Sequence, residues 1–462
     1  MSDEADVECC TYGAWMGRNG MKAAGGVHNR WRTLKSLSRH TVSPRLAGWS
    51  VLVGLLSGIV VSSFRWILEH SLRLATRFYS VVLPAHVMLL IPLILGLLAA
   101  SLIIGKLVVS QPLIQGSGIP DIESRLRKQS SPSFPWWSVL WKKFIGGVLY
   151  IGSGLFAGRE GPCIQMGACV GMGLSGSTMT TKTYKRELVA AGAAAGLSAA
   201  FNAPIAAILF VTEEVYGKFN VRIGIAAFTA ALSANAVSTM LFGTAPVFIL
   251  PRVETPHFGQ YWQMAVLAVL LGLIAWVYEI TLLRSHSLFT LMRIPRGLRS
   301  LLPMLLTALI GISAPQLLGG GNALVTLIGN HHYTFGLLTA FLLIRFVLSQ
   351  ITYGSGSPGG IFLPILTLGA LAGAAWGSLL TTAPFTSAGT DGSGIITLML
   401  ILGMSGLFGA VSKAPITSII LVTEMTSYDL LMPLGFVTLI SYLTFDILGG
   451  KPIYDALAQS HE

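Results

Sequence analysis

Charge is scarce in this sequence, since only 11% of its 462 residues are Asp, Glu, Lys or Arg and 53% are hydrophobic. The mean hydropathy is +0.70, which excludes an ordinary water-soluble globular protein. Acidic residues are the rarer sign, 19 against 30 basic ones, so the formal net charge is +11. Runs without charge recur, and several are long enough to cross a bilayer: residues 78–105, 188–212, 223–251, 300–344 and 346–390.

The alternating spacing of amphipathic strands is missing, which argues against a transmembrane β-barrel. We therefore predict an all-α protein that crosses the membrane many times. Basic residues gather beside the apolar runs, in the N-terminal segment and at 284–299, and the positive-inside rule places both in the cytoplasm. No surface of interleaved aromatic and basic residues is evident, so we expect no nucleic-acid partner.

Motifs of common enzyme classes are absent, including HExxH, the Walker loop and the dinucleotide fingerprint. ATP-driven pumping therefore has no support. Two GxSG sequences, at 173–176 and 403–406, match the motif of rhomboid-type intramembrane proteases. A catalytic serine needs a nearby base, yet the only histidine after Ser405 is His461. With 52 glycines in the chain, such matches arise by chance, and we expect no enzymatic activity.

Cysteines number four and show no metal-ligand spacing, so we expect neither a metal site nor a resident cofactor. Cys163 and Cys169 lie in an apolar stretch and are interpreted as packing residues. Residues 1–44 have no apolar core followed by a cleavage site, so they do not resemble a signal peptide. We interpret them as a cytoplasmic extension and assign them no function.

The sequence GREGP at 158–162 places two ionisable residues deep in an apolar region, where charge is expensive unless it has a functional role. Its glycines expose backbone N–H groups, and Pro162 suits the first turn of a helix. Such a helix start attracts anions, and Glu160 is itself an anion at that point. One hypothesis is that Glu160 gates an anion path; the alternative is a helix cap paired with Arg159.

A second sequence of the same design is GSGIP at 116–120. Ser117 is either a helix cap or a neutral hydroxyl donor to a dehydrated anion. A neutral donor favours transport, because the ion must be able to leave.

The chain also repeats itself. Residues 196–213 contain GL, API and VTE in an order that recurs at 406–424, and the glycines of 158–161 are echoed at 356–359. Two similar halves with interrupted helices are typical of secondary transporters and related channels. Glu213 has a counterpart in Glu424, whereas Glu214 aligns with Met425. A residue present in both halves favours a structural role, so Glu214 is the better candidate for proton chemistry, although both acids could simply be solvated.

Together these stretches resemble the CLC family of chloride channels and chloride/proton antiporters, from about Leu46 to Leu457. The resemblance is carried by five motifs in order: GSGIP at 116–120, GREGP at 158–162, AAFNAP at 199–204, GSPGGIFLP at 356–364 and GKPIY at 450–454. It implies a transmembrane domain at 45–457, built from two inverted repeats at about 45–250 and 251–457. Many of its helices are tilted or interrupted.

The resemblance also implies residue roles. Glu160 matches the gating and proton-transfer glutamate, Glu214 matches the internal proton-transfer glutamate, and Lys143 matches a buried lysine near the path. Hydroxyl groups or backbone N–H groups at five positions are implied to bind chloride: Ser117, Gly161, Ile361, Phe362 and Tyr454. Bound chloride is then a substrate rather than a cofactor.

On this resemblance we expect a homodimer in a lipid bilayer, with one chloride and proton pathway in each subunit. The absence of CBS domains after Tyr454 favours a prokaryotic member, located in the inner (plasma) membrane with both termini in the cytoplasm. The acid at Glu214 favours chloride/proton exchange. A passive chloride channel of the same fold, gated by voltage or pH, is the alternative.

Overall fold

The computed structural model describes residues 44–127, 133–178, 182–217, 220–251, 253, 255–382, 392–426 and 430–460. The chain divides into two units, Met1–Pro44 and Arg45–Glu462, and the helices below belong to the second. The predicted N-terminal extension at 1–44 lies outside the described residues except for Pro44.

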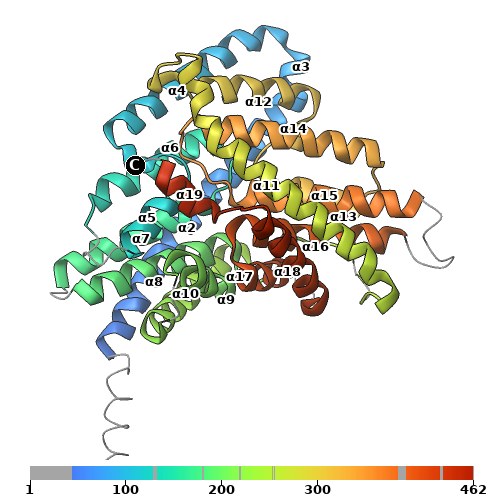
Figure 1. Cartoon of the computed structure of the whole chain (residues 1–462). Helices are drawn as coiled ribbons and strands as arrows, with labels where there is room; N and C mark the ends of the chain where they lie inside the picture. The colour runs from blue at the N-terminus through green and yellow to red at the C-terminus, as the bar shows by residue number, and fades with distance from the viewer. Residues whose placement is uncertain are drawn as a thin grey trace, which may run out of the picture. The chain divides into compact units, whose positions relative to one another are not determined.

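Helices make up this unit, and no strand occurs in the described ranges (Figure 1). The α-helices are α2 (Pro44–Arg77), α3 (Leu83–Ala85), α4 (Leu90–Ser110), α5 (Ile119–Arg127), α6 (Trp136–Ile151), α7 (Glu160–Thr178), α8 (Lys182–Phe201), α9 (Pro204–Phe210), α10 (Val221–Phe242), α11 (Tyr261–Leu291), α12 (Leu301–Ser313), α13 (Asn322–Asn330), α14 (Phe335–Gly354), α15 (Phe362–Thr382), α16 (Gly392–Ser412), α17 (Pro415–Thr426), α18 (Leu431–Ile447) and α19 (Ile453–Ser460). Among the described residues, eight helical stretches are long and apolar enough, by length and composition, to span a membrane. The predicted all-α polytopic membrane class is confirmed.

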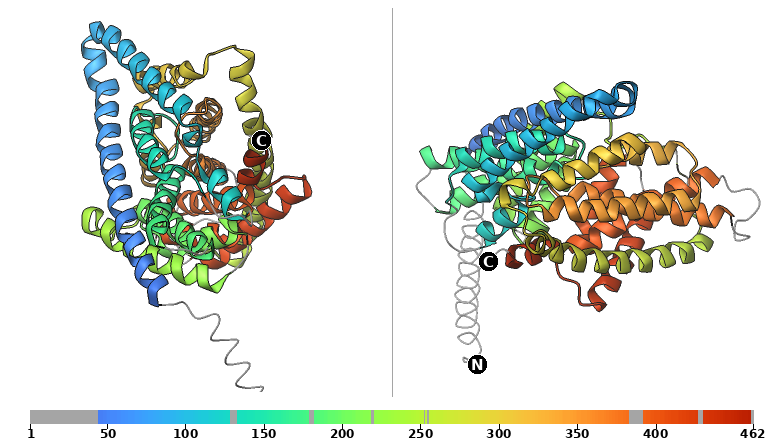
Figure 2. Two further views of the ribbon diagram at one scale, coloured as in Figure 1. Left: turned by 90° about the vertical axis from the view of Figure 1, so that its left-hand side faces the viewer. Right: turned by 90° about the horizontal axis from the view of Figure 1, so that it is seen from above.

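Burial separates central from peripheral spans. The apolar windows of α15 and α16 are 89% and 94% buried inside the protein, whereas that of α4 is 28% buried. The first two therefore lie in the core, and α4 presents most of its apolar surface outward, as a lipid-facing helix does. The central pair lies side by side, with α14 against α15 (Figure 2).

The repeat is visible in the helix breaks. In the first half α8 ends at Phe201, Asn202 has φ 58°, and α9 starts at Pro204. In the second half α16 ends at Ser412, Lys413 has φ 53°, and α17 starts at Pro415. In both halves a residue in the left-handed conformation, followed two positions later by proline, ends the helix, because neither residue fits the interior of a continuous α-helix. The two-fold repeat predicted from the sequence is confirmed.

Glycines bring the paired helices into close contact. A Cβ atom added to Gly167 of α7 would lie 2.0 Å from the carbonyl oxygen of Gly192 in α8. In the second half, a Cβ atom on Gly369 of α15 would lie 2.2 Å from the carbonyl oxygen of Gly403 in α16. Small residues allow such close approach of helices in a membrane. The alanines and glycines of residues 190–200 allow this close packing of α8 against α7.

We predict that Gly167→Ala lowers the free energy of unfolding by about 1–3 kcal/mol, because the added methyl group overpacks the α7–α8 contact. Gly176→Ala, on the same helix with open space around its Cβ position, is the matched control and should not destabilise the protein. Thermal unfolding of the two purified variants in detergent measures the difference. Equal stability of both variants would contradict the packing role.

Candidate ion-transport site

Backbone hydrogen bonds tie three helix starts together. The Gly158 N–H donates to the Gly360 carbonyl at 2.7 Å, and the Gly360 N–H returns a bond to the Gly158 carbonyl at 2.8 Å. The Gly359 N–H also donates to the Gly116 carbonyl at 3.1 Å. The loops that precede α5, α7 and α15 therefore meet at one place, although they are far apart in the sequence.

Predicted chloride ligands lie at this junction. A Cβ atom on Gly161 would lie 2.3 Å from the Ser117 Oγ, so the first turn of α7 faces the Ser117 hydroxyl directly. The backbone nitrogen of Gly161 lies 3.2 Å from the Cβ position of Gly360, the residue before Ile361. Ser117, Ile361 and Phe362 are all buried. The structure thus brings together four of the five predicted chloride-binding positions.

Glu160 is the first residue of α7 and is fully buried. A Cβ atom on Gly158 would meet Glu160 Oε2 at 2.3 Å and the Leu363 backbone nitrogen at 3.1 Å. The carboxylate and that N–H group therefore lie near the same point, at the starts of α7 and α15. Within the described residues neither carboxylate oxygen makes a well-formed hydrogen bond.

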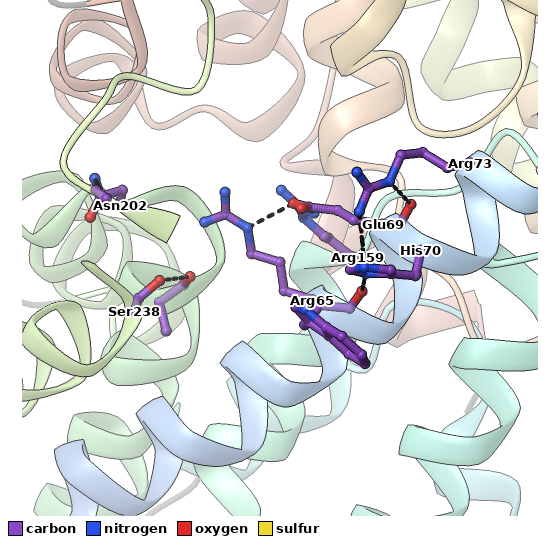
Figure 3. Close-up of polar contacts among 10 residues, drawn as sticks. Arg65, Glu69, His70, Arg73, Arg159, Asn202 and Ser238 are labelled. Atoms are coloured by element: carbon purple, nitrogen blue, oxygen red, sulfur yellow. Dashed lines mark hydrogen bonds and ion pairs between the residues drawn. The ribbon is translucent and has the colours of Figure 1, made fainter. Parts of the chain in front are cut away.

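Arg159 does not pair with Glu160, contrary to the alternative considered from the sequence. Its Nη1 lies 2.9 Å from Oε1 of Glu69 on α2, and the same oxygen lies 2.9 Å from Nε of Arg65 (Figure 3). Glu69 therefore holds two arginines, which leaves the neighbouring carboxylate of Glu160 to face the junction. The sequence carried no sign of this pairing beyond the helical spacing of Arg65 and Glu69.

Lys143 supplies positive charge at the junction. It is fully buried on α6, and its Nζ donates to the carbonyl groups of Ile114 and Gly116 at 3.0 and 2.8 Å. These bonds satisfy the ammonium group while leaving its charge beside the Gly116 loop. A buried cation raises the local potential in favour of anions.

Aromatic rings surround Phe362. The rings of Phe201, Phe210 and Phe408 have centroids 5.4, 5.6 and 4.3 Å from its own. The ring of Phe210 also meets that of Tyr454 edge-on at 6.2 Å. Tyr454, the fifth predicted ligand, is therefore one ring away from Phe362, and its buried hydroxyl has no hydrogen-bond partner in the described part of the chain.

Among the cavities that border this region, two lie beside predicted site residues or their sequence neighbours. One of about 330 Å³ is lined by Ser117, Gly118, Tyr353 and neighbouring residues. The other, of about 60 Å³, is lined by Arg159, Leu363 and residues around them. Cavities thus lie beside both Ser117 and the sequence neighbours of Glu160, as an ion path through the junction would require.

Glu213 and Glu424 have matching roles. Glu213 accepts hydrogen bonds from the first N–H groups of α17, with the Thr417 nitrogen at 2.7 Å. Glu424 does the same for α9, with the Ala206 nitrogen at 2.7 Å. Each half therefore caps a helix of the other half, which supports the structural role inferred for Glu213 from the repeat.

Glu214 differs from its neighbour. It lies in a π-helical turn, η4 (Val211–Val215), a feature often found at functional sites, and it is only 3% exposed. The alternative in which both acids are solvated is therefore wrong for Glu214. The Glu214 carbonyl accepts a hydrogen bond from Arg127, which also pairs with Asp455 and Glu123. The sequence did not predict that these three residues meet, because no motif joins them.

The serines of the GxSG sequences have other partners. Ser405 Oγ lies 2.7 Å from the Thr438 hydroxyl and 3.2 Å from the Ser418 hydroxyl. Ser175 Oγ donates to the Met172 carbonyl. These are packing contacts rather than the serine–base pair of a protease.

Known proteins resemble the chain over most of its length. Residues 95–446 match the model of a family described as voltage gated chloride channel. The H(+)/Cl(-) exchange transporter ClcA of Vibrio cholerae serotype O1 is 35% identical over 424 residues, 88% of each chain. ClcA of Salmonella arizonae is 34% identical over 448 residues, 93% of this chain and 91% of the relative.

Solved structures agree with this resemblance. A slow cyanobacterial Cl-/H+ antiporter superposes with a TM-score of 0.80 and 28% identity, covering 91% of this chain and 99% of the other. A CLC-type fluoride/proton antiporter shares the fold, with a TM-score of 0.71 and 22% identity over 86% of this chain and 94% of the other.

We predict that Glu213→Ala and Glu424→Ala each reduce the free energy of unfolding by about 1 kcal/mol, the usual cost of losing a helix cap. The two losses should be similar because the two contacts are equivalent. Asp446→Ala, which removes an acid 52% exposed in its pair with Lys413, should change stability little. Thermal unfolding of the three variants tests this. A Glu424→Ala protein as stable as the wild type would contradict the reciprocal caps.

Proposed function

Because this chain belongs to the voltage-gated chloride channel (CLC) family, we propose that it exchanges chloride for protons across a membrane. Relatives that match it over most of their length are named H(+)/Cl(-) exchange transporters. The observation that carries the proposal is the buried carboxylate of Glu160 at the junction of three tied helix starts.

Chloride binds through neutral donors in this account. The hydroxyl groups of Ser117 and Tyr454 hold it on the cytoplasmic side, and backbone N–H groups near Gly161, Ile361 and Phe362 hold it centrally. Neutral donors replace the water lost from the ion without trapping it, and Lys143 supplies favourable potential from nearby. The rings around Phe362 exclude water from the central site.

Glu160 is the gate. Its ionised carboxylate is attracted to the same helix starts that attract chloride, so the side chain and the ion compete for one place. Protonation removes the charge and weakens the competition. The exchange follows from this competition, since chloride enters the central site as a protonated Glu160 leaves it.

Glu214 delivers protons from the cytoplasmic side. It is buried, it is titratable, and its counterpart in the second half is Met425, so the repeat does not require an acid there. A passive channel needs no second acid, and this is why the proposal is exchange rather than channel conduction.

The proposed setting is the inner membrane of a prokaryote, with the transport domain at 45–457, residues 1–44 in the cytoplasm and the C-terminus on the same side. Two copies of the chain form a homodimer with one pathway in each subunit, surrounded by lipid. Transport proceeds without a cofactor, a nucleic-acid partner or an enzymatic step.

We predict that Glu214→Gln abolishes proton movement and leaves chloride flux in place, because glutamine cannot carry a proton. Glu213→Gln is the matched control and should keep exchange. Reversal potentials in liposomes under opposed chloride and proton gradients measure the coupling. If the wild type moves no protons, the protein is a channel. If Glu213→Gln loses proton coupling and Glu214→Gln keeps it, the choice of Glu214 over Glu213 is wrong.

We predict that Glu160→Gln removes both proton coupling and the pH dependence of chloride flux, since the neutral amide mimics the protonated gate at every pH. Chloride release from liposomes with a potassium shunt, measured between pH 5 and pH 8, checks this in the range where buried carboxyl groups titrate, because burial disfavours the charged form. A Glu160→Gln protein that still drives protons against their gradient would remove Glu160 from the mechanism.

A further inference from the structure

Arg127 ends α5 and contacts three other polar groups. Its Nη1 donates to both carboxylate oxygens of Asp455, at 2.7 and 2.8 Å. Its Nη2 donates to the Glu214 carbonyl at 2.5 Å and lies 2.7 Å from Oε1 of the buried Glu123. One guanidinium group therefore joins α5, the π-helical turn η4 and α19.

Each joined element carries, or directly follows, a segment that holds a residue with a proposed transport role. Asp455 directly follows Tyr454 at the start of α19, and Glu214 belongs to η4. Helix α5 begins at Ile119, two residues after Ser117. The same side chain thus reaches the supports of both cytoplasmic chloride ligands and of the internal proton acid.

The chemistry of arginine suits a fixed link. The guanidinium is planar and its donors point in set directions, so Nη1 bonded to Asp455 and Nη2 bonded to the Glu214 carbonyl fix the relative orientation of these two groups as well as their distance. Arg127 and Asp455 are 35% and 32% exposed, so water weakens the attraction between them without removing the geometry. Partial burial opposes the charge of Asp455, but the neighbouring Glu123 and Arg127 side chains hold its pKa below the usual value. Asp455 therefore remains a carboxylate near neutral pH.

Helix α19 depends on such contacts for its position. It has only eight residues, and an isolated helix of that length is not stable in water. It packs against α5 and α11, and just before it the Lys451 N–H donates to Glu279 Oε1 at 3.0 Å. The Arg127–Asp455 bond is made by the residue next to Tyr454, so it helps to fix the first turn of α19, from which the Tyr454 side chain projects.

We propose that Arg127 is a positioning residue that couples the chloride path to the proton path. By holding Asp455 and the Glu214 carbonyl in one bonded group, it keeps Tyr454 and Glu214 from moving independently. A chloride step at Tyr454 is then accompanied by a proton step at Glu214. This inference rests on the proposed exchange function and adds to it the residues that prevent uncoupled leak.

The test is Arg127→Leu reconstituted in liposomes beside the wild type. Without the link, chloride should pass without an accompanying proton, so the reversal potential should shift toward the equilibrium potential of chloride alone. Asp455→Asn should shift it in the same direction, and the double variant should shift it no further than Arg127→Leu. Arg127→Lys keeps the positive charge but loses the planar arrangement of donors. Its coupling should therefore lie between that of the wild type and that of Arg127→Leu.

Arg125→Leu is the matched control, since Arg125 lies on the same helix and pairs with Asp121 at 2.8 Å. It should keep the wild-type reversal potential. An Arg127→Leu protein with wild-type coupling overturns the inference and leaves the proposed function standing. A folded Arg127→Leu protein that loses both fluxes in equal proportion also overturns it, because the role would then be structural. A wild type that moves no protons overturns the proposed function and this coupling role together.

Discussion

The pair of backbone hydrogen bonds between Gly158 and Gly360 is the constraint on which the site depends. Both residues belong to irregular backbone within a membrane domain, where unpaired N–H and C=O groups are costly. Bonding the two loops to each other satisfies these groups and fixes the starts of α7 and α15 side by side. The third loop joins through Gly116, and Gly161 leaves room for the Ser117 hydroxyl.

The two halves share their supports but differ in their chemistry. The left-handed residue before α9 or α17, the glycine contacts within each helix pair and the reciprocal caps of Glu213 and Glu424 occur in both. Glu160 and Glu214 occur in the first half only. The repeated features build a stable frame, and the unrepeated acids carry the gating and proton transfer that we propose for them. This division explains how a scaffold built from two similar halves can support the proposed transport path, which has a different acid, Glu160 or Glu214, at each of two points.

Much of this frame was predictable from the sequence, because it depends on local chemistry. The break at 201–204 follows from Asn202 and Pro204, the close packing at 190–200 follows from small residues, and the different surroundings of the two adjacent acids follow from comparing the halves. The long-range pairs were not predictable. Arg159 bonds Glu69 rather than Glu160, and Arg127 bonds Asp455 across 328 residues. Such contacts depend on tertiary packing and leave no period or motif in the sequence.

In the proposed mechanism the tied helix starts form one anion site, for which the Glu160 carboxylate competes with chloride. Crystals of the wild type and of Glu160→Gln, grown in bromide, test it directly because bromide scatters anomalously and replaces chloride. We expect anomalous density beside the Ser117 and Tyr454 hydroxyls and the backbone nitrogens of Ile361 and Phe362. We also expect additional density in Glu160→Gln where the wild-type carboxylate lies. Bromide bound elsewhere, with none at this junction in either protein, would contradict the account.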